Sequence, residues 1–166
     1  MMERHTAYIC AGSNIGDKQL NCKNGIDALT MDSACVLKGQ SAYYKTAPVD
    51  YRDQDWFVNV VFKIETTLDP LQLLAHLKSI EQEAGRLADT VRFGPRILDL
   101  DIIFYDDLVM HTPRLVIPHP RMHKRRFVLK PICDIDPEAF HPIFKKSVQQ
   151  LLDLLGEDGQ MVVVYS

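Results

Sequence analysis

Residues 56–65 carry the clearest alternation of apolar and polar positions in the chain. The even positions are all apolar: Trp56, Val58, Val60, Phe62 and Ile64. Because successive side chains of a β-strand point to opposite faces, this spacing predicts a strand with one buried face. The other face would begin with Phe57 and Asn59.

The helical period is clearest in residues 69–85. Asp69 can cap the first turn, Pro70 suits that turn, and Gln72 completes a sequence that resembles a capping box. The apolar stripe of this helix consists of Leu73, Leu74, Leu77, Ile80 and Ala84. Gly85 is expected to end it.

The rest of the chain predicts shorter elements. Further strands are expected at residues 5–10, 36–45, 98–105 and 161–165. Helices are expected at residues 17–29 and 147–155, with a basic turn or short helix at residues 121–126. Loops are expected at residues 46–55, 86–95 and 113–120. Because strands and helices mix without strict alternation, this order favours an α+β fold, with a mostly antiparallel sheet and helices on one face.

The strand at residues 98–105 carries two carboxylates on an otherwise apolar face. One face would hold Leu98, Leu100, Ile102 and Phe104, and the other Ile97, Asp99, Asp101, Ile103 and Tyr105. Neighbouring carboxylates repel, and burial strengthens the repulsion, so a positive group is expected between them. Mg²⁺ fits, because one or two carboxylates usually hold it together with water and phosphate oxygens. A solvated strand edge, or salt bridges to nearby arginines, is the alternative.

Three arginines lie close to this pair in the sequence. Arg92 and Arg96 bracket Phe-Gly-Pro directly before the strand, and Arg86 opens the preceding loop. Guanidinium groups bind phosphates through two parallel hydrogen bonds, and carboxylates beside arginines are typical of phosphoryl-transfer sites. Taken singly, each arginine could equally be a solvated loop charge. The chain contains no Walker motif and no protein-kinase motif set, which excludes those two scaffolds.

The charge distribution agrees with a small anionic ligand. The 166 residues carry a net charge of −3, but residues 86–130 contain nine Lys or Arg and only five Asp. A local basic zone in an acidic chain suits a small anion better than a long nucleic acid. The four cysteines are widely scattered without metal-ligand spacing, so free thiols are expected. The sequence predicts no signal peptide or membrane span, and hence one cytoplasmic domain over residues 1–166.

Two further positions have side chains suited to ligand binding. His119 lies between Pro118 and Pro120, which restrict the backbone and could aim the imidazole. Phe57 and Asn59 share one strand face, where an aromatic ring and an amide could stack on and hydrogen-bond a flat heterocycle. The alternatives are an ordinary loop histidine, core packing of Phe57 and strand-edge bonding by Asn59.

These stretches together resemble the 6-hydroxymethyl-7,8-dihydropterin pyrophosphokinases of the folate pathway. The resemblance is strongest in RFGPRILDLDI at residues 92–102 and covers nearly all of the chain up to about residue 136. Further matching positions are Ala7-Tyr8-Ile9, Gly12-Ser13-Asn14, Tyr44-Lys45-Thr46, Phe57 with Asn59, Glu81 with Gly85-Arg86, Ile117-Pro118-His119, Arg125 and Phe127. Within the loop, Ala88 and Asp89 stand where the family often has basic residues, which makes the loop less positive. Phe93 stands where the family commonly has an indole ring, so the contacts that close the loop are expected to differ.

The resemblance implies a ferredoxin-like αβ sandwich with helices packed on its faces. It also implies a reaction, the transfer of pyrophosphate from ATP to the hydroxymethyl group of the pterin with release of AMP. Two Mg²⁺ ions would bridge the ATP phosphates, held by Asp99 and Asp101. Arg86, Arg92 and Arg96 would act in catalysis from a flexible loop that closes over the site.

The resemblance also assigns residues to the two substrates. ATP would contact Arg92, Ile102, Arg114, His119 and Arg125. The pterin would contact Thr46, Ala47, Val49, Phe57, Asn59 and Phe127, with its ring between the two phenylalanines. ATP and the pterin would be the partners of a monomeric chain that binds no nucleic acid. A non-catalytic ferredoxin-like module that binds a nucleotide or another ligand is the alternative.

Overall fold

The computed structural model describes residues 3–48, 54–85, 96–156 and 161–165. Its helices are α1 (Lys18–Thr30), α2 (Pro70–Glu83), α3 (Arg126–Ile135) and α4 (Val148–Leu155), with one 3₁₀ turn, η1 (Met122–Lys124). Its strands are β1 (His5–Ser13), β2 (Cys35–Gln40), β3 (Tyr44–Thr46), β4 (Phe57–Thr66), β5 (Asp99–Tyr105), β6 (Met110–His111), β7 (Val116–Ile117), β8 (Phe140–His141), β9 (Lys146–Ser147) and β10 (Val162–Val164). No helix in the described ranges is long and apolar enough to cross a membrane.

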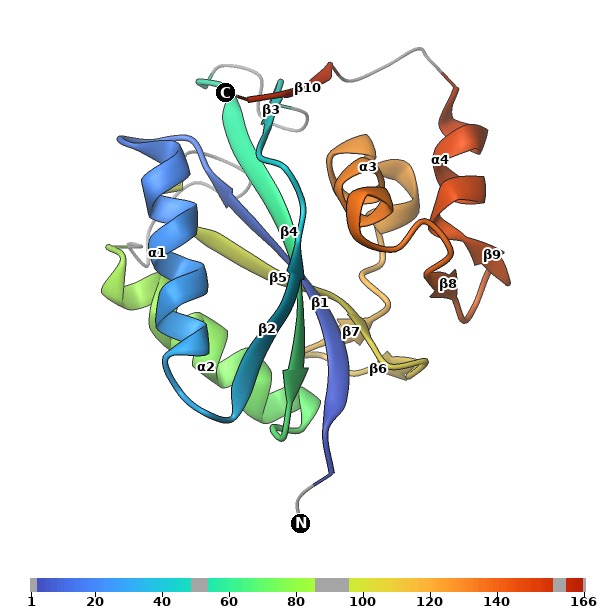
Figure 1. The fold of residues 1–166 in the computed structure, drawn as a ribbon, viewed down its shortest axis with the longest axis horizontal. Coiled ribbons are helices and arrows are strands. Elements are labelled where there is room, and N and C mark those ends of the chain that lie inside the picture. The colour runs from blue at the N-terminus through green and yellow to red at the C-terminus, as the bar shows by residue number, and fades with distance from the viewer. Residues whose placement is uncertain (1–2, 49–53, 86–95, 157–160, 166) are drawn as a thin grey trace.

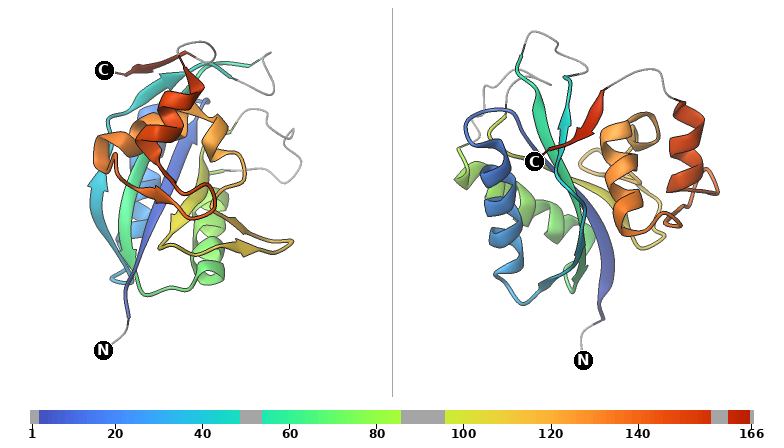
Figure 2. Two further views of the ribbon diagram at one scale, coloured as in Figure 1. Left: turned by 90° about the vertical axis from the view of Figure 1, so that its right-hand side faces the viewer. Right: turned by 45° about the horizontal axis from the view of Figure 1, so that its top comes forward.

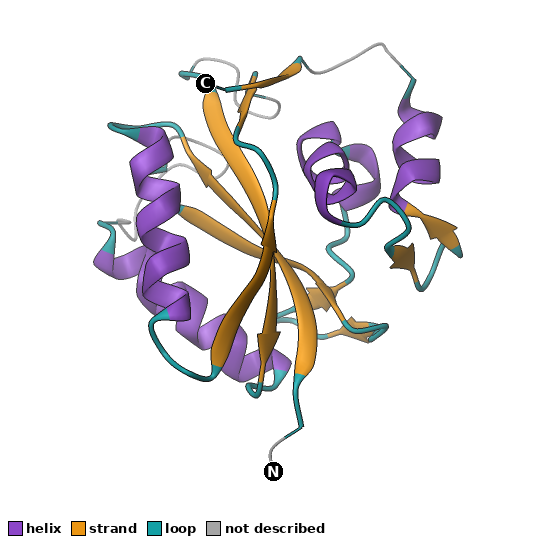
Figure 3. Cartoon of the chain, in the orientation of Figure 1, coloured by secondary structure: helices purple, strands orange, loops and turns teal. Residues whose placement is uncertain are grey.

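Six strands form one sheet in which every described pair is antiparallel. The order is β10-β3-β4-β1-β5, and β2 pairs with β4 next to β3. The helices lie in two layers, with α1 and α2 on one side of the sheet and α3 and α4 on the other (Figures 1, 2 and 3). The α+β prediction is therefore confirmed, whereas the expectation of helices on one face alone is wrong.

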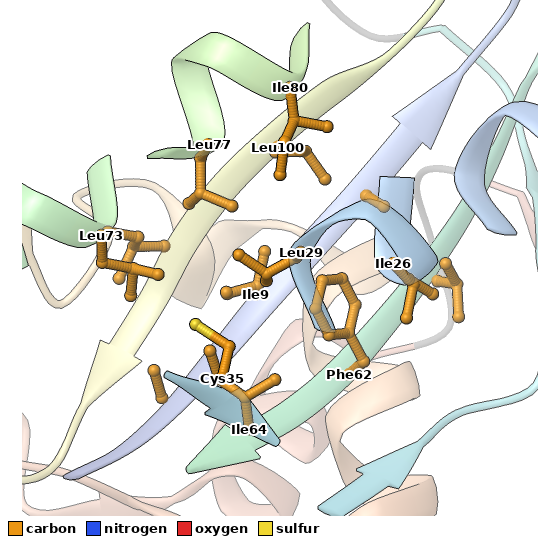
Figure 4. Packing of buried hydrophobic residues seen from close by; sticks show 14 of the residues in the cluster. Ile9, Ile26, Leu29, Cys35, Phe62, Ile64, Leu73, Leu77, Ile80 and Leu100 are labelled. Carbon is orange, nitrogen blue, oxygen red and sulfur yellow. The ribbon is translucent and has the colours of Figure 1, made fainter. Parts of the chain in front are cut away.

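The main core fills the space between the sheet and the first two helices (Figure 4). Val58, Val60, Phe62 and Ile64 of β4 are fully buried there, as the alternation in residues 56–65 predicts. The α2 helix begins with the expected capping box, because Asp69 Oδ1 accepts from the Gln72 amide at 2.8 Å and Gln72 Oε1 accepts from the Asp69 amide at 2.9 Å.

A second core covers the opposite face of the sheet and depends on a helix that the sequence pattern did not predict. Val128, Leu129 and Ile132 of α3 pack there with Val61 of β4. Two arginines, Arg125 and Arg126, stand at the start of this helix, and Pro131 lies inside it. The local sequence therefore predicts only a basic turn at this point, because proline disfavours the interior of a helix. Packing on the sheet overrides this weak local preference.

A β-bulge changes the faces of β5. Ile9 pairs with Ile102 but Tyr8 pairs with Phe104, so Ile103 is an extra residue on β5. Phe104 consequently packs in the second core together with Ile103, and Tyr105 packs in the main core. The prediction that Phe104 shares a face with Leu100 is therefore wrong, although Asp99 and Asp101, which precede the bulge, keep the predicted alternation.

The strand expected at residues 36–45 is in fact two strands. Both β2 and β3 pair with β4, β2 along its second half and β3 along its first. Thr46, which was expected to open a loop, is the last residue of β3 and is buried. This break places Thr46 opposite Phe57, at the start of β4.

Two carboxylates at the end of α3 hold that helix against the sheet. Asp134 accepts a 2.6 Å hydrogen bond from the Tyr44 hydroxyl of β3 and one from the Ala42 amide. Asp136 accepts from the Tyr8 hydroxyl of β1 and, at 2.8 Å, from the Lys63 ammonium of β4. Three strands therefore fix the position of one helix.

Replacing Tyr44 by Phe tests this attachment. Tyr44 is 2% exposed, so Tyr44→Phe leaves the apolar packing intact and removes the bond to Asp134. We expect the free energy of unfolding to fall by about 1–2 kcal/mol, as for other hydrogen bonds to charged groups. Urea denaturation of a double-mutant cycle with Asp134→Ala measures the coupling between the two side chains. A coupling free energy near zero would contradict the interpretation.

Candidate functional site

Three neighbouring strands place an aspartate, a glycine and an asparagine in one row across the sheet. Gly12 of β1 pairs with Asp99 of β5 on one side and with Asn59 of β4 on the other. Side chains paired in this way lie on the same face of a sheet. Since adjacent strands are about 4.8 Å apart, the carboxylate and the amide start roughly 10 Å from one another. Gly12, which has no side chain, leaves room for the Asn59 amide to lie against the backbone of β1.

The next row of the same face shows where this site lies. Cys10 of β1 pairs with Asp101 and with Val61, and both Cys10 and Val61 belong to the core beneath α3. The Asp pair and Asn59 therefore lie on the α3 side of the sheet, where α3 begins. The sequence pattern predicted that the two carboxylates share a face, and the register confirms it.

The electrostatics of the Asp pair favour a cation. Burial and the neighbouring carboxylates of Asp99 and Glu81 raise the pKa of Asp101 to about 8, against the opposing charges of Arg125 and Lys78. A carboxyl group with such surroundings stays ionised at neutral pH only if positive charge is brought to it. Asp99 and Asp101 are both partly accessible, so an ion and its other ligands can reach them.

The donor set suits Mg²⁺ bound together with phosphates. Among the residues that the structure describes, no group of three or more His, Cys, Asp or Glu side chains is arranged to hold a metal. Asp99 and Asp101 supply two carboxylates, which is the usual protein share of a Mg²⁺ site when a phosphorylated substrate supplies further oxygens. The pair therefore fits a hard divalent cation.

His119 faces the same site as a neutral donor. Burial and the charges of Arg125 and Arg121 lower its pKa to about 4, while the charge of Asp99 opposes this shift. Its Nδ1 accepts a hydrogen bond from the Arg121 amide at 3.1 Å, which leaves the ring proton on Nε2. The His119 amide in turn donates to the Ile103 carbonyl of β5 at 3.0 Å. The chain thus fixes both the place and the tautomer of this ring.

Arg125 and Phe127 connect the carboxylate end of the site to α3. Arg125 is the N-cap residue of α3, and its guanidinium carbon lies 5.4 Å from the centre of the Phe127 ring. Its positive charge lowers the pKa values of both Asp101 and His119. One arginine therefore lies between the Asp pair and an aromatic ring that is only partly buried.

A hydrogen bond from Thr46 fixes the orientation of the Asn59 side-chain amide. Thr46 Oγ1 donates a 2.5 Å hydrogen bond to Asn59 Oδ1, and both residues are buried. The Nδ2 atom points to Gly12, since a Cβ built on that glycine would lie 2.7 Å from it. The same Cβ would lie 3.9 Å from Phe57 Cδ1, so the aromatic ring and the amide meet above Gly12.

Alanine at Gly12 is expected to damage this end of the site selectively. A Cβ at 2.7 Å from Nδ2 would displace the Asn59 amide, which its bond to Thr46 otherwise fixes. If the chain takes the pterin and the nucleotide that the family resemblance implies, we expect Gly12→Ala to raise the KM of the pterin about 10-fold or more, with little change in the KM of the nucleotide. Steady-state kinetics in both substrates measure this. Equal changes in the two KM values would instead indicate a general disturbance of β1.

Comparisons with known proteins agree with this arrangement. The profile of the family described as 7,8-dihydro-6-hydroxymethylpterin-pyrophosphokinase (HPPK) matches residues 8–137. The chain belongs to the HPPK family. It is 42% identical to the 2-amino-4-hydroxy-6-hydroxymethyldihydropteridine pyrophosphokinase of Bacillus subtilis, over 78% of this chain and 77% of that protein. It is 40% identical to the corresponding protein of Haemophilus influenzae, over 89% of this chain and 94% of that protein.

Some relatives in the family are much longer. The folic acid synthesis protein fol1 of Schizosaccharomyces pombe is 40% identical over 92% of this chain, which spans only 21% of that protein. A crystal structure of HPPK-DHPS from Plasmodium falciparum superposes with a TM-score of 0.75, at 15% identity, over 93% of this chain and 43% of that one. The structural likeness confirms the ferredoxin-like αβ fold of the HPPK family.

The structure brings together only part of the residue set expected from the family resemblance. Asp99, Asp101, His119, Arg125 and Phe127 gather at the start of α3, with Phe57, Asn59 and Thr46 across Gly12. Arg96 is 9% exposed just before β5, where its backbone amide and carbonyl both bond to Asn14. Outside the described residues lie Val49, Arg86, Ala88, Asp89, Arg92 and Phe93.

Three other expected contacts lie differently. The Ile102 side chain belongs to the main core, so a nucleotide could meet only the backbone at this position. Arg114 is exposed in the turn between β6 and β7, where its amide bonds to Thr112. The Ala47 amide bonds to the Met161 carbonyl at 3.3 Å, so in this conformation it faces the chain beside β10.

Sequence reasoning gave no role to Asn14 and Glu81. The Asn14 side chain accepts from the Arg96 amide and donates to Gln54 and to the Asp55 carbonyl, so it joins three segments around the site. Glu81 is 1% exposed. The sequence does contain a signal for a buried Glu81. This acid follows Leu73 and Leu77 at intervals of four residues and therefore falls on the apolar stripe of the helix.

Proposed function

We propose that the chain transfers pyrophosphate from ATP to the hydroxymethyl group of 6-hydroxymethyl-7,8-dihydropterin, producing AMP and the pterin diphosphate for folate biosynthesis. The row Asp99, Gly12 and Asn59 is the observation that carries this proposal. In this row the Asn59 end would bind a heterocycle, and the Asp99 end would bind phosphates through a cation. The hydroxymethyl arm of the pterin would run along this row from the heterocycle to the phosphates.

The pterin half consists of an amide and two aromatic rings. Asn59, with Oδ1 held by Thr46, would hydrogen-bond the edge of the pterin, while Phe57 and Phe127 would stack on its two faces. The backbone near Ala47 and Val49 would complete the recognition of the edge, as the family resemblance implies. These polar contacts discriminate strongly, because a ligand that lacks them leaves buried groups unpaired.

The phosphate half consists of cationic and neutral donors. Arg125 lies beside the Asp pair, and the Nε2–H of the neutral His119 can donate to a phosphate oxygen. The family resemblance adds Arg86, Arg92, Arg96 and Arg114, and a backbone contact at Ile102. Several fixed guanidinium groups would stabilise the charge that builds on phosphate oxygens in the transition state.

Asp99 and Asp101 would hold two Mg²⁺ ions. When bound, the ions supply charge neutralisation and alignment of the triphosphate oxygens. The raised pKa of Asp101 supports this assignment, because the site is poorly suited to two bare carboxylates.

The reaction exchanges one phosphorus–oxygen bond for another. The pterin hydroxyl oxygen attacks the β-phosphorus in line, and the bond from that phosphorus to the α,β-bridging oxygen breaks, so AMP leaves. The hydroxyl proton is lost in the process, and no dedicated base is assigned. The residues of this chain act mainly by orienting the two substrates and by stabilising charge.

The non-catalytic ferredoxin-like module is not favoured. A module that binds no phosphorylated substrate would not require two neighbouring carboxylates, one of which, Asp101, has a strongly raised pKa. Strongly shifted pKa values are typical of functional sites. A single catalytic domain over residues 1–166, acting as a monomer in the cytoplasm, stays a prediction. Gel filtration with light scattering tests the monomer.

A product assay tests the proposed reaction. The protein is mixed with ATP, Mg²⁺ and the hydroxymethyldihydropterin, and the nucleotide and pterin products are separated by chromatography. Pterin-dependent AMP together with pterin diphosphate is expected. Formation of ADP would mean transfer of a single phosphoryl group, and binding without turnover would favour the module.

A further inference from the structure

Glu81 has unusual surroundings for an acidic residue. It lies in the last turn of α2 and is 1% exposed. The carbonyl end of a helix disfavours negative charge, and Glu81 also adds its charge to that of Asp99 next to Asp101. Because the helix end and the neighbouring carboxylates both disfavour the charge of Glu81, this buried carboxylate requires a compensating hydrogen bond.

That bond runs to the strand of the Asp pair. Glu81 Oε2 accepts a hydrogen bond from the Leu100 amide at 2.6 Å. Leu100 is the residue between Asp99 and Asp101, so the carboxylate is bonded to the backbone at the centre of the pair. A short bond from a backbone amide to a carboxylate is stronger than one between neutral groups.

The topology explains why the backbone needs this acceptor. β5 is the last strand of the main sheet, with β1 on one side and no further strand of that sheet beyond it in the described ranges. The Leu100 amide bonds to Glu81 rather than to β1, so it belongs to the open side of β5. Glu81 supplies the acceptor that another strand would otherwise supply.

We infer that Glu81 is a positioning residue, which fixes the backbone between Asp99 and Asp101 and thereby sets the geometry of the metal-binding pair. This inference rests on the proposed function. Helix α2 provides a rigid base for it, because Leu77 and Ile80 pack on Leu100 in the main core (Figure 4). The helix and the strand are thus joined by apolar packing and by one hydrogen bond to the backbone.

Glu81 approaches the Asp pair from the other face of the sheet. α2 covers the face of the sheet opposite to α3 (Figure 1). The Asp pair lies on the α3 side, because Asp101 pairs with Cys10, which belongs to the core beneath α3. The second oxygen of Glu81, Oε1, lies 3.5 Å from the Lys78 ammonium on the same helix. The hydrogen bond from the Leu100 amide to Oε2 is therefore the contact through which Glu81 acts on the Asp pair.

Two conservative variants separate the hydrogen bond from the charge. Glu81→Gln keeps an oxygen acceptor at the same reach and removes the charge, whereas Glu81→Asp keeps the charge but is one methylene too short to reach the Leu100 amide. Glu83→Gln, on the exposed side of the same helix end, is the matched control. Binding of Mn²⁺ in the presence of α,β-methylene ATP is measured by electron paramagnetic resonance.

If Glu81 acts through its bond to Leu100, Glu81→Asp binds Mn²⁺ about 10–100-fold more weakly than the wild type, as for other partners of metal ligands. Glu81→Gln and the control stay within about 5-fold of it. Hydrogen exchange of the Leu100 amide accelerates in Glu81→Asp alone. In turnover, kcat falls in Glu81→Asp while the KM of the pterin is unchanged.

The reverse order, with Glu81→Gln weak and Glu81→Asp normal, would overturn the inference, because charge rather than the hydrogen bond would then matter. Equal Mn²⁺ affinity in both variants would overturn it as well. Failure of the proposed function gives a different result, in which the wild type binds no Mn²⁺ with the nucleotide. A wild type that binds Mn²⁺ but forms no pterin diphosphate contradicts the reaction alone.

Discussion

Asp101→Asn is expected to abolish turnover and at the same time to stabilise the metal-free protein. The amide loses the charge that would hold the cation, so kcat should fall on the order of 10³-fold. Without metal, the wild-type carboxylate lies near Asp99 and Glu81 in a partly buried place. Removing it relieves this repulsion, and we expect the free energy of unfolding at pH 8 to rise by about 1–3 kcal/mol.

The pH dependence of this gain follows from the direction of the pKa shift. The pKa of Asp101 is raised from an ordinary value of 3.8 to about 8, so the folded protein binds this proton more tightly than the unfolded chain. The resulting stabilisation of the wild type is complete below about pH 4 and is lost as the pH rises to about 8. Asp101→Asn has no such dependence, so its advantage should grow over this window.

Thermal unfolding in EDTA from pH 5 to pH 9 measures the difference between the two proteins. Asp107→Asn, an exposed acid just after β5, is the matched control and should change neither kcat nor stability. Added Mg²⁺ with a nucleotide should stabilise the wild type but not Asp101→Asn. If Asp101→Asn were less stable than the wild type at pH 8, the carboxyl would be favourable in the free protein and the electrostatic account would be wrong.

Arg125→Ala is expected to produce the second-largest loss. The guanidinium lies near the Asp pair, His119 and the ring of Phe127. Its removal takes away a phosphate donor and a cation–π contact, so kcat/KM should fall about 10²–10³-fold. The pKa of His119 should also rise, because the charge of Arg125 helps to lower it. NMR titration of the His119 ring gives this second measurement.

The adjacent arginine provides the control for this experiment. The Arg126 guanidinium donates to the Gly156 carbonyl near the end of α4. Arg126→Ala removes the same charge from the same turn, so kinetics that depend only on net charge would be altered equally in both variants. Equal losses would assign Arg125 a general electrostatic role and would contradict its place beside the phosphates.

Strand patterns with local causes could be predicted from the sequence. The faces of β4 and the capping box of α2 follow from alternation and from hydrogen bonds between near neighbours, and both predictions are confirmed. α3 could not be predicted in this way, because two arginines and an internal proline hide it. The bulge at Ile103 arises from pairing with a strand far away in the sequence, which a local pattern does not contain.

The site shows the same division. Asp99 and Asp101 were found because two carboxylates interrupt an apolar strand face. Gly12 was matched only as part of a motif, since its importance comes from the register that places it between Asp99 and Asn59. The contribution of Glu81 also arises only in three dimensions, because residues 19 positions apart meet when α2 packs on β5.

The edge position of β5 also affects how the protein behaves at high concentration. An unpaired strand edge is a template for association with a second chain, and charged side chains are one of the features that prevent it. Asp99 and Asp101 place two carboxylates on the strand that ends the main sheet. We therefore expect the two residues proposed for metal binding, once ionised, to disfavour pairing of this strand with a second chain. Asp101→Asn, although expected to unfold at higher temperature, should consequently self-associate more readily than the wild type above about pH 8.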